Sequence, residues 1–295
     1  GLLSGLYPAL YLSAFKPVQV LQGVFQAGNQ NLCLRKGLGV LQFTVSIALI
    51  AGTIVVIQQV NFIRHRELGF EKEKLLIIEN LGNLTDNSVE NLREAVAQIP
   101  QVEKVGGSNG ILGGQNGATG AVAKGSTDGA LINFSTVDHD YLHVMNLQFK
   151  YGRNFSREFP SDTLDRVILN EAALRDLGIK GDPIGTLITD DPGAEKVRYF
   201  TIIGVVKDFH FTNLRSEIKP YMFRLDAKGI DKFAVKISSS DFPGTINALK
   251  SAWNSLEPDR PFQYFFLDEA FDKLYKADEN FKVVFSALTM GAIYI

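Results

Sequence analysis

Cysteine is almost absent from this sequence, and acidic residues are absent from its beginning. The chain of 295 residues has one cysteine, Cys33, so no internal disulfide can stabilise it, and its folded part needs a hydrophobic core. None of its 32 aspartates and glutamates precedes Glu67. The net charge of −2 and the lack of basic clusters argue against nucleic-acid binding.

Signatures of nucleotide binding are also missing. Glycine is frequent from Gly106 to Gly120, but the sequence lacks G-x-x-x-x-G-K-[S/T], and Lys124-Gly125-Ser126 has the reverse order. We therefore interpret residues 106–120 as a mobile loop and not as a phosphate-binding loop.

Two polar pairs are the remaining candidates for chemistry. His139 and His143 have a spacing that can place both on one helical face, but a metal site needs a third and usually a fourth ligand. Asp208 and His210 alternate and can share one strand face, yet no nucleophile in a recognisable context accompanies them. We interpret the histidines as surface residues on a short helix, and we predict no catalytic residue, no cofactor and no metal.

One long hydrophobic run is present. Residues 40–57 read VLQFTVSIALIAGTIVVI and contain no charged residue. They also lack the polar face that a helix packed on the core of a soluble protein normally has. With its flanks the run reaches the roughly 20 residues that cross a bilayer. Its aliphatic and aromatic residues each favour insertion by about 0.3–0.6 kcal/mol. We predict a transmembrane helix at residues 38–60; the alternative is a helix buried in a large soluble core.

Shorter apolar segments lie at both ends of the sequence. Residues 1–15 and 281–295 are nearly free of charge, and we expect each to be part of a further transmembrane helix. Residues 16–37 carry basic and no acidic residues, so the positive-inside rule predicts a cytoplasmic connection. Basic residues also follow the central run, but long domains translocate largely regardless of charge. The part that follows is therefore predicted to be extracytoplasmic.

Residues 61–280 are predicted to form a large α+β domain with two lobes. Two strand–helix–strand patterns suggest a split βαβ ferredoxin-like lobe at 61–111 and 231–270, and the stretch between them, 112–230, suggests an inserted, mostly-β lobe. The predicted units are 74–79, 86–99 and 102–106, then 233–238, 241–256 and 262–267, and the strands predicted in the insertion are 131–137, 166–169, 200–206 and 221–225.

Both connections of this domain to the apolar segments are predicted to be helical. Gln58 to Arg66 continues the central run, and the spacing of Leu267, Phe271 and Phe281 continues a helix toward the last apolar segment. A stiff helix can transmit a displacement, whereas a Gly/Ser linker cannot.

Several strings of residues resemble one family of membrane proteins. Ser4-Gly-Leu-Tyr-Pro-Ala-Leu-Tyr-Leu-Ser-Ala-Phe-Lys-Pro-Val begins the series, and Arg35-Lys-Gly-Leu and Leu68-Gly-Phe flank the central run. The large domain adds Gly152-Arg-Asn-Phe, Val167-Ile-Leu-Asn-Glu-Ala-Ala, Asp182-Pro-Ile-Gly and Ile202-Ile-Gly-Val-Val-Lys-Asp-Phe-His-Phe. Over nearly its whole length the chain is similar to ABC-transporter permeases of the FtsX/MacB type with a MacB-like periplasmic core domain. It most resembles a fragment of the eight-span form with two repeats.

The resemblance implies a function, partners and a location. It implies a permease subunit that couples ATP hydrolysis by a separate ABC ATPase subunit to movement of an extracytoplasmic domain (mechanotransmission), for export or extraction of a peptide, drug, lipoprotein or similar cargo. It further implies a porter-like lobe and an inserted lobe, a multi-pass protein in the lipid of the bacterial inner membrane, a permease dimer or two-repeat pseudo-dimer, and an extracytoplasmic partner protein. The family supplies no catalytic residue.

Two other functions remain open from the sequence. The extracytoplasmic sensory domain of a membrane receptor would be followed, after Ile295, by a HAMP-like or kinase segment. A membrane-anchored enzyme would depend on the His139/His143 or Asp208/His210 pair.

Overall fold

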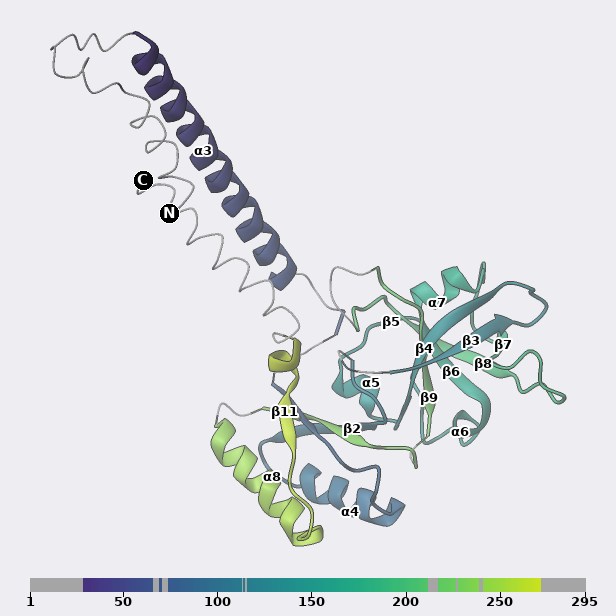
Figure 1. Cartoon of the computed structure of the whole chain (residues 1–295). Coiled ribbons are helices and arrows are strands. Elements are labelled where there is room, and N and C mark those ends of the chain that lie inside the picture. The colour runs from purple at the N-terminus through teal and green to yellow at the C-terminus, as the bar shows by residue number, and fades with distance from the viewer. Residues whose placement is uncertain are drawn as a thin grey trace. The chain divides into compact units, whose positions relative to one another are not determined.

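The structure is a computed structural model of the chain (Figure 1). It describes residues 29–65, 69–70, 74–112, 114, 116–211, 217–226, 228–238 and 241–271. The chain divides into two units, Val60–Glu279 and the remainder at both ends. The predicted membrane segments at 1–15 and 281–295, and the cytoplasmic connection before Asn29, lie outside the described residues.

A single long helix, α3 (Asn29–His65, 37 residues), contains the hydrophobic run. Large apolar side chains of the run are exposed, among them Val40, Phe43 and Ile47 at 67%, 73% and 65%. The described side chains of α3 are those of residues 36–37, 39–55 and 58. Within the described ranges, none of the helices combines the length and the hydropathy of a membrane span. The span predicted at 38–60 stays a prediction.

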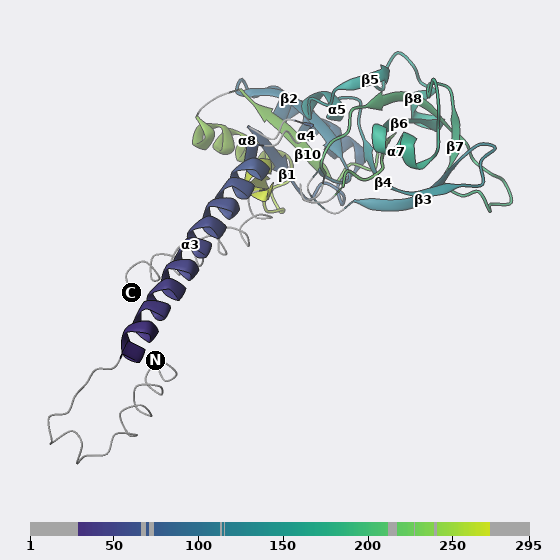
Figure 2. The same ribbon diagram turned by 90° about the horizontal axis from the view of Figure 1, so that it is seen from above.

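Four strands and two helices of the Val60–Glu279 unit form the two predicted strand–helix–strand patterns. The strand order is β11–β1–β10–β2, with all neighbours antiparallel. Helices α4 and α8 pack on this sheet, where Leu92 and Trp253 are fully buried with Phe233. Figures 1 and 2 show these elements as one group. Their bounds are β1 Leu75–Ile78, α4 Asp86–Ala97, β2 Val102–Ser108, β10 Lys232–Ile237, α8 Phe242–Leu256 and β11 Tyr264–Phe266.

Local sequence explains where these helices begin. The Thr85 side chain accepts a hydrogen bond from the Ser88 N–H at 3.2 Å, and the Asp241 side chain accepts one from the Gly244 N–H at 3.0 Å. Each bond satisfies a backbone donor that the first turn of a helix leaves free. Strand β1 is buried on both faces because its alternate side chains reach two different hydrophobic cores.

The segment between β2 and β10 contains, in its described part, seven strands and three short helices. The sheet continues as β2–β4–β3–β7–β8–β6–β9, with β5 on β8 and an additional β4–β9 pair. Pairs β4–β9 and β6–β8 are parallel, and the other pairs are antiparallel. The four strands predicted here are confirmed as β4, β6, β8 and β9. The bounds are β3 Gly117–Ala123, β4 Gly129–Val137, α5 Tyr141–Val144, β5 Phe149–Gly152, α6 Asp162–Asp165, β6 Arg166–Asn170, α7 Glu171–Asp176, β7 Leu187–Thr189, β8 Phe200–Val206 and β9 Tyr221–Leu225.

The interpretation of residues 106–120 as one mobile loop is wrong. Strand β2 includes Gly106, and strand β3 begins at Gly117. A Cβ on Gly106 would lie 2.5 Å from the Tyr141 Cα, so glycine allows α5 to pack against the β2 backbone. Glycine is depleted in most strands, which is why its frequency suggested a loop.

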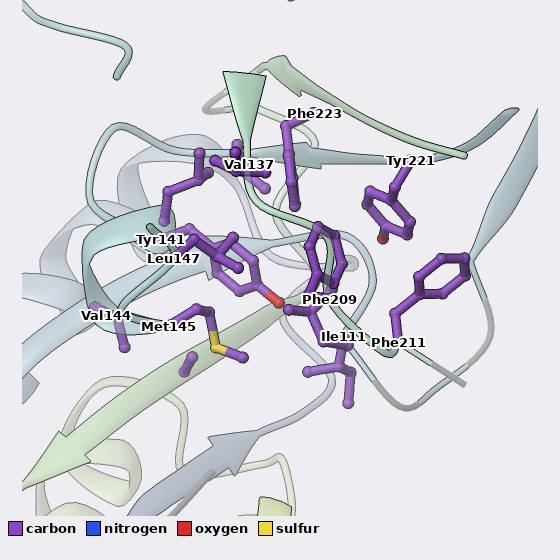
Figure 3. Close-up of a cluster of buried hydrophobic side chains, with 14 of the residues drawn as sticks. Ile111, Val137, Tyr141, Val144, Met145, Leu147, Phe209, Phe211, Tyr221 and Phe223 are labelled. Atoms are coloured by element: carbon purple, nitrogen blue, oxygen red, sulfur yellow. The ribbon is translucent and has the colours of Figure 1, made fainter. Parts of the chain in front are cut away.

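One buried core joins both groups of strands in this unit. It brings together Leu75 of β1 and Ala234 of β10 with Ile168 of β6 and Phe223 of β9. Figure 3 shows part of this core, where aliphatic side chains pack with the rings of Phe209, Tyr221 and Phe223. Each large apolar side chain that is buried contributes about 1.5–3 kcal/mol. The strands β11–β1–β10–β2 and the strands β3 to β9 are therefore held together by this shared core and not by a chain connection alone.

Candidate functional site

The places where the chain enters and leaves the large domain pack together in the shared core. Phe70 follows α3, and Phe271 lies in the helical segment 267–271 that follows β11. Their ring centroids are 5.6 Å apart, a distance at which aromatic pairs attract each other. Leu267 and Phe271 are fully buried. We call Gly69, Phe70, Leu267 and Phe271 the junction; the predicted helix beyond residue 271 lies outside the described residues.

Gly69 is the tightest point of the junction. Its φ is +85°, in the left-handed region that residues with a Cβ rarely adopt. A Cβ at this position would lie 2.7 Å from the Asp208 carbonyl oxygen and 2.9 Å from the Phe209 Cα. The backbone at Gly69 therefore packs directly on the backbone at 208–209, and only glycine fits there.

The segment 207–211 connects the junction to the rest of the domain. It follows β8 and is not a strand, so the prediction that Asp208 and His210 share a strand face is wrong. Asp208 turns instead to the beginning of α7, where it accepts hydrogen bonds from the Ala172 N–H and the Arg175 Nη2, both at 2.7 Å. The free N–H groups of a helix N-terminus favour a carboxylate at this place. His210 is buried.

Phe209 anchors this segment in the shared core (Figure 3). Its side chain is fully buried, and its ring lies 5.9, 5.3 and 5.8 Å from the rings of Phe211, Tyr221 and Phe223. Tyr221 and Phe223 belong to β9. Close-packed side chains transmit strain because they leave little free volume. The junction, segment 207–211 and β9 form one continuous packed path.

A charged cluster lies around the connection from β4 to α5. Arg93 of α4 and Arg157 both bind the Asp140 carboxylate, at 3.2 and 2.7 Å. Burial raises the pKa of Asp140, but the hydrogen bond from Arg157 and the two arginine charges bring it below its ordinary value. Asp138 is buried and accepts hydrogen bonds from three backbone N–H groups at 2.6–3.0 Å. Burial still raises the pKa of Asp138 to about 6.

The raised pKa of Asp138 predicts a pH-dependent stability. The folded protein binds the proton more tightly than the unfolded chain, so this group stabilises the fold fully below about pH 4, and the contribution is lost as the pH rises through 6. Relative to Asp138→Asn, the free energy of unfolding of the wild type should fall by about 2–3 kcal/mol between pH 4 and pH 7. Denaturant titrations at several pH values measure the difference. Asp128→Asn, at an exposed position, is the control, and an equal slope for both variants would contradict the prediction.

The two histidines do not form a pair. The interpretation as surface residues on a short helix is confirmed for His143, which is exposed on α5, whereas His139 precedes α5 and is half-buried, so the two share no helical face. His139 lines a cavity of about 220 Å³, and His143 lines another of about 480 Å³. Burial and the nearby Arg157 charge lower the pKa of His139. Within the described parts of the chain, no group of three or more His, Cys, Asp or Glu could hold a metal ion.

A cavity of about 560 Å³ opens among β4, β6, β8 and β9. No sequence pattern predicts this cavity, because its lining comes from separate segments of the chain that only the fold brings together. Its basic lining residues are Arg166, Arg198, Arg224 and Lys228.

Comparison with known proteins identifies relatives of the large domain. A protein-family model described as "MacB-like periplasmic core domain" matches residues 37–241. No curated protein matches the sequence.

Solved structures with similarity to this chain have low sequence identity to it. The periplasmic region of MacB from Actinobacillus actinomycetemcomitans has a TM-score of 0.51 and 16% identity, covering 70% of this chain and 94% of that chain. The extracellular domain of the noncanonic ABC-type transporter YknZ from Gram-positive bacteria has a TM-score of 0.47 and 14% identity, covering 65% of this chain and 98% of that chain. The likeness to the MacB region supports the mixed α/β fold.

Proposed function

Because the chain belongs to the family of the MacB-like periplasmic core domain, and so to the FtsX/MacB-type ABC transporter permeases, we propose that it is the permease subunit of such a transporter. In this proposal the chain hydrolyses no ATP. A separate ABC ATPase subunit does so, and the permease converts that work into movement of its extracytoplasmic domain. The cargo is a peptide, drug, lipoprotein or similar molecule that is exported or extracted.

The first support is the character of α3. Exposed Val40, Phe43 and Ile47 would be unfavourable in water and are favourable in lipid. The hydroxyls of Thr44 and Thr53 donate to the carbonyls of the residues four positions earlier, both at 2.8 Å, so neither needs water as an acceptor. We propose that residues 38–60 cross the inner membrane and that residues 61–280 lie outside the cytoplasm.

The second support is the order of the strands. In β11–β1–β10–β2, each strand–helix–strand unit contributes two strands, and strands of the two units alternate. This order fits a ferredoxin-like porter lobe made from 61–111 and 231–270, with the inserted lobe at 112–230. The porter lobe then carries both connections to the membrane, and the inserted lobe is available for an extracytoplasmic partner or for cargo.

The observation that carries the proposal is the contact between Phe70 and Phe271. These residues belong to the two chain segments that we propose connect the domain to the membrane. Phe271 is part of the shared core, and the half-buried Phe70 packs against it. A displacement of either connection therefore acts on the shared core, and through segment 207–211 on β9. We further propose that two permeases, or the two repeats of one permease, face each other across the transported cargo.

The proposal predicts how ATPase activity is distributed. The purified permease in lipid should show no ATP hydrolysis, and activity should appear when the separate ATPase subunit is added. Phe271→Leu, which keeps most of the buried volume, should lower the cargo-dependent part of this activity by weakening the junction, while the exposed Phe159→Ala should not. Phosphate release in proteoliposomes measures both. ATP hydrolysis by the permease alone would rule the proposal out.

A further inference from the structure

The cavity among β4, β6, β8 and β9 has an excess of positive charge near its wall. Arg166, Arg198, Arg224 and Lys228 line it, against the carboxylates of Asp162 and Asp226. The charge of Asp162 is already neutralised, because Arg153 binds both its oxygens, at 2.6 and 2.9 Å.

Two of the guanidinium groups lie against one aromatic ring. The Arg198 Cζ is 5.0 Å and the Arg224 Cζ is 4.5 Å from the centroid of the Phe200 ring. Like charges held near each other repel, and an anion between or beside them relieves the repulsion. Asp190 binds the Nη2 of Arg224 at 2.7 Å, which neutralises one of the two charges.

Hydrogen-bond donors remain free at this place. The Nε of Arg224 is buried and has no hydrogen-bond partner among the residues that the structure describes. Arg198 donates to the carbonyl oxygen of Leu164, and in the described part of the chain no carboxylate forms an ion pair with it. Arg198 and Lys228 are exposed and line the cavity, so their donors are the ones that an acceptor in the cavity can reach.

We propose that this cavity binds a phosphate group. Guanidinium groups match the oxygens of an oxyanion with paired N–H donors. The cavity is lined by three arginines and a lysine, of which Arg166 is already bound by the Asp165 carboxylate. A phosphate monoester has three terminal oxygens for these donors, whereas a carboxylate has two. The group comes from a soluble phosphate ester or from a phospholipid headgroup. The inference does not depend on transport activity.

Calorimetric titration of the full chain in a zwitterionic detergent tests the site, with inorganic phosphate as the probe and acetate at equal ionic strength as the comparison. Saturable phosphate binding is expected, with acetate at least tenfold weaker. Arg198→Gln and Arg224→Gln should each weaken phosphate binding at least tenfold. Lys196→Gln removes a charge two residues from Arg198, outside the cavity lining, and should change it less than twofold.

Several results would overturn the proposal: no saturable binding, equal affinity for acetate, or equal weakening by Lys196→Gln. Arg198 is exposed, so its variant should fold even if the Arg224 variant does not.

Dihexanoyl phosphatidic acid, a soluble short-chain lipid, distinguishes the two sources of the phosphate group, a phospholipid headgroup and a soluble phosphate ester. Binding of this lipid at least tenfold tighter than phosphate indicates a headgroup, and equal or weaker binding indicates a soluble ester, provided that both depend on Arg198.

Discussion

Phe271→Ala is expected to lower the free energy of unfolding of the large domain by about 3–5 kcal/mol. The Phe271 side chain is fully buried, and its ring packs on that of Phe70 with centroids 5.6 Å apart. Truncation loses the transfer free energy of the ring and leaves a cavity that the surrounding strands can fill only in part. Denaturant unfolding measures the loss, followed by the fluorescence of Trp253, the only tryptophan of the chain.

Phe159→Ala is the matched control. This ring is 45% exposed and lies under the Arg153 guanidinium, 4.1 Å from its Cζ, so its removal should cost less than about 1 kcal/mol. A loss for Phe271→Ala no larger than for Phe159→Ala would show that the junction is not packed as described. Trp253 belongs to the core under α4 and α8 and not to the core of Phe271, so a coincident transition also tests whether the two cores unfold together.

The elements that could be predicted from the sequence are those with local signals. Helix α8 has an Asp cap, an early proline and buried residues at helical spacing. Strand β10 reads Lys-Phe-Ala-Val-Lys-Ile, so its large apolar residues occupy every second position. Such signals depend on a few neighbouring residues and do not depend on how the rest of the chain folds. Both strand–helix–strand units can be predicted from the sequence for this reason.

Other strands gave no such signal. Strand β3 reads Gly-Ala-Thr-Gly-Ala-Val-Ala, so its side chains are too small to show an alternation, and strand β7 has three residues. Their pairing with β4 and β8 places them in the sheet. Tertiary context decides strand formation where the local preference is weak.

The candidate site could not be predicted from sequence patterns for a related reason. The Asp208 and His210 alternation suggested a strand, but the Asp208 carboxylate binds the start of α7, more than thirty positions earlier. In the sequence, the Leu68-Gly-Phe string indicates only a family resemblance. Its physical role is the contact between Gly69 and Phe209. These residues are far apart in the sequence, and no local sequence pattern predicts a contact between them.

That contact makes Gly69→Ala the second large expected effect. A methyl group at Gly69 would lie 2.7 Å from the Asp208 carbonyl oxygen and 2.9 Å from the Phe209 Cα, both backbone atoms that cannot rotate away. The left-handed φ of +85° costs about 1–2 kcal/mol for a residue with a Cβ, and the steric overlap adds about 1–3 kcal/mol. The free energy of unfolding should therefore fall by about 2–5 kcal/mol.

Gly125→Ala separates the two causes. Gly125 has the same φ of +85°, but a Cβ there would meet nothing within 4 Å, so this variant should lose only the conformational part, about 1–2 kcal/mol. The difference between the two variants, measured by denaturant unfolding under one set of conditions, is the energy of the overlap at the junction. In the proposed permease, Gly69→Ala should also displace segment 207–211 and lower cargo-dependent ATPase activity, while Gly125→Ala leaves it unchanged. Equal losses of stability would mean that the chain does not pack on 208–209 where it enters the domain, and the packed path from the membrane connection to β9 would then lack its first contact.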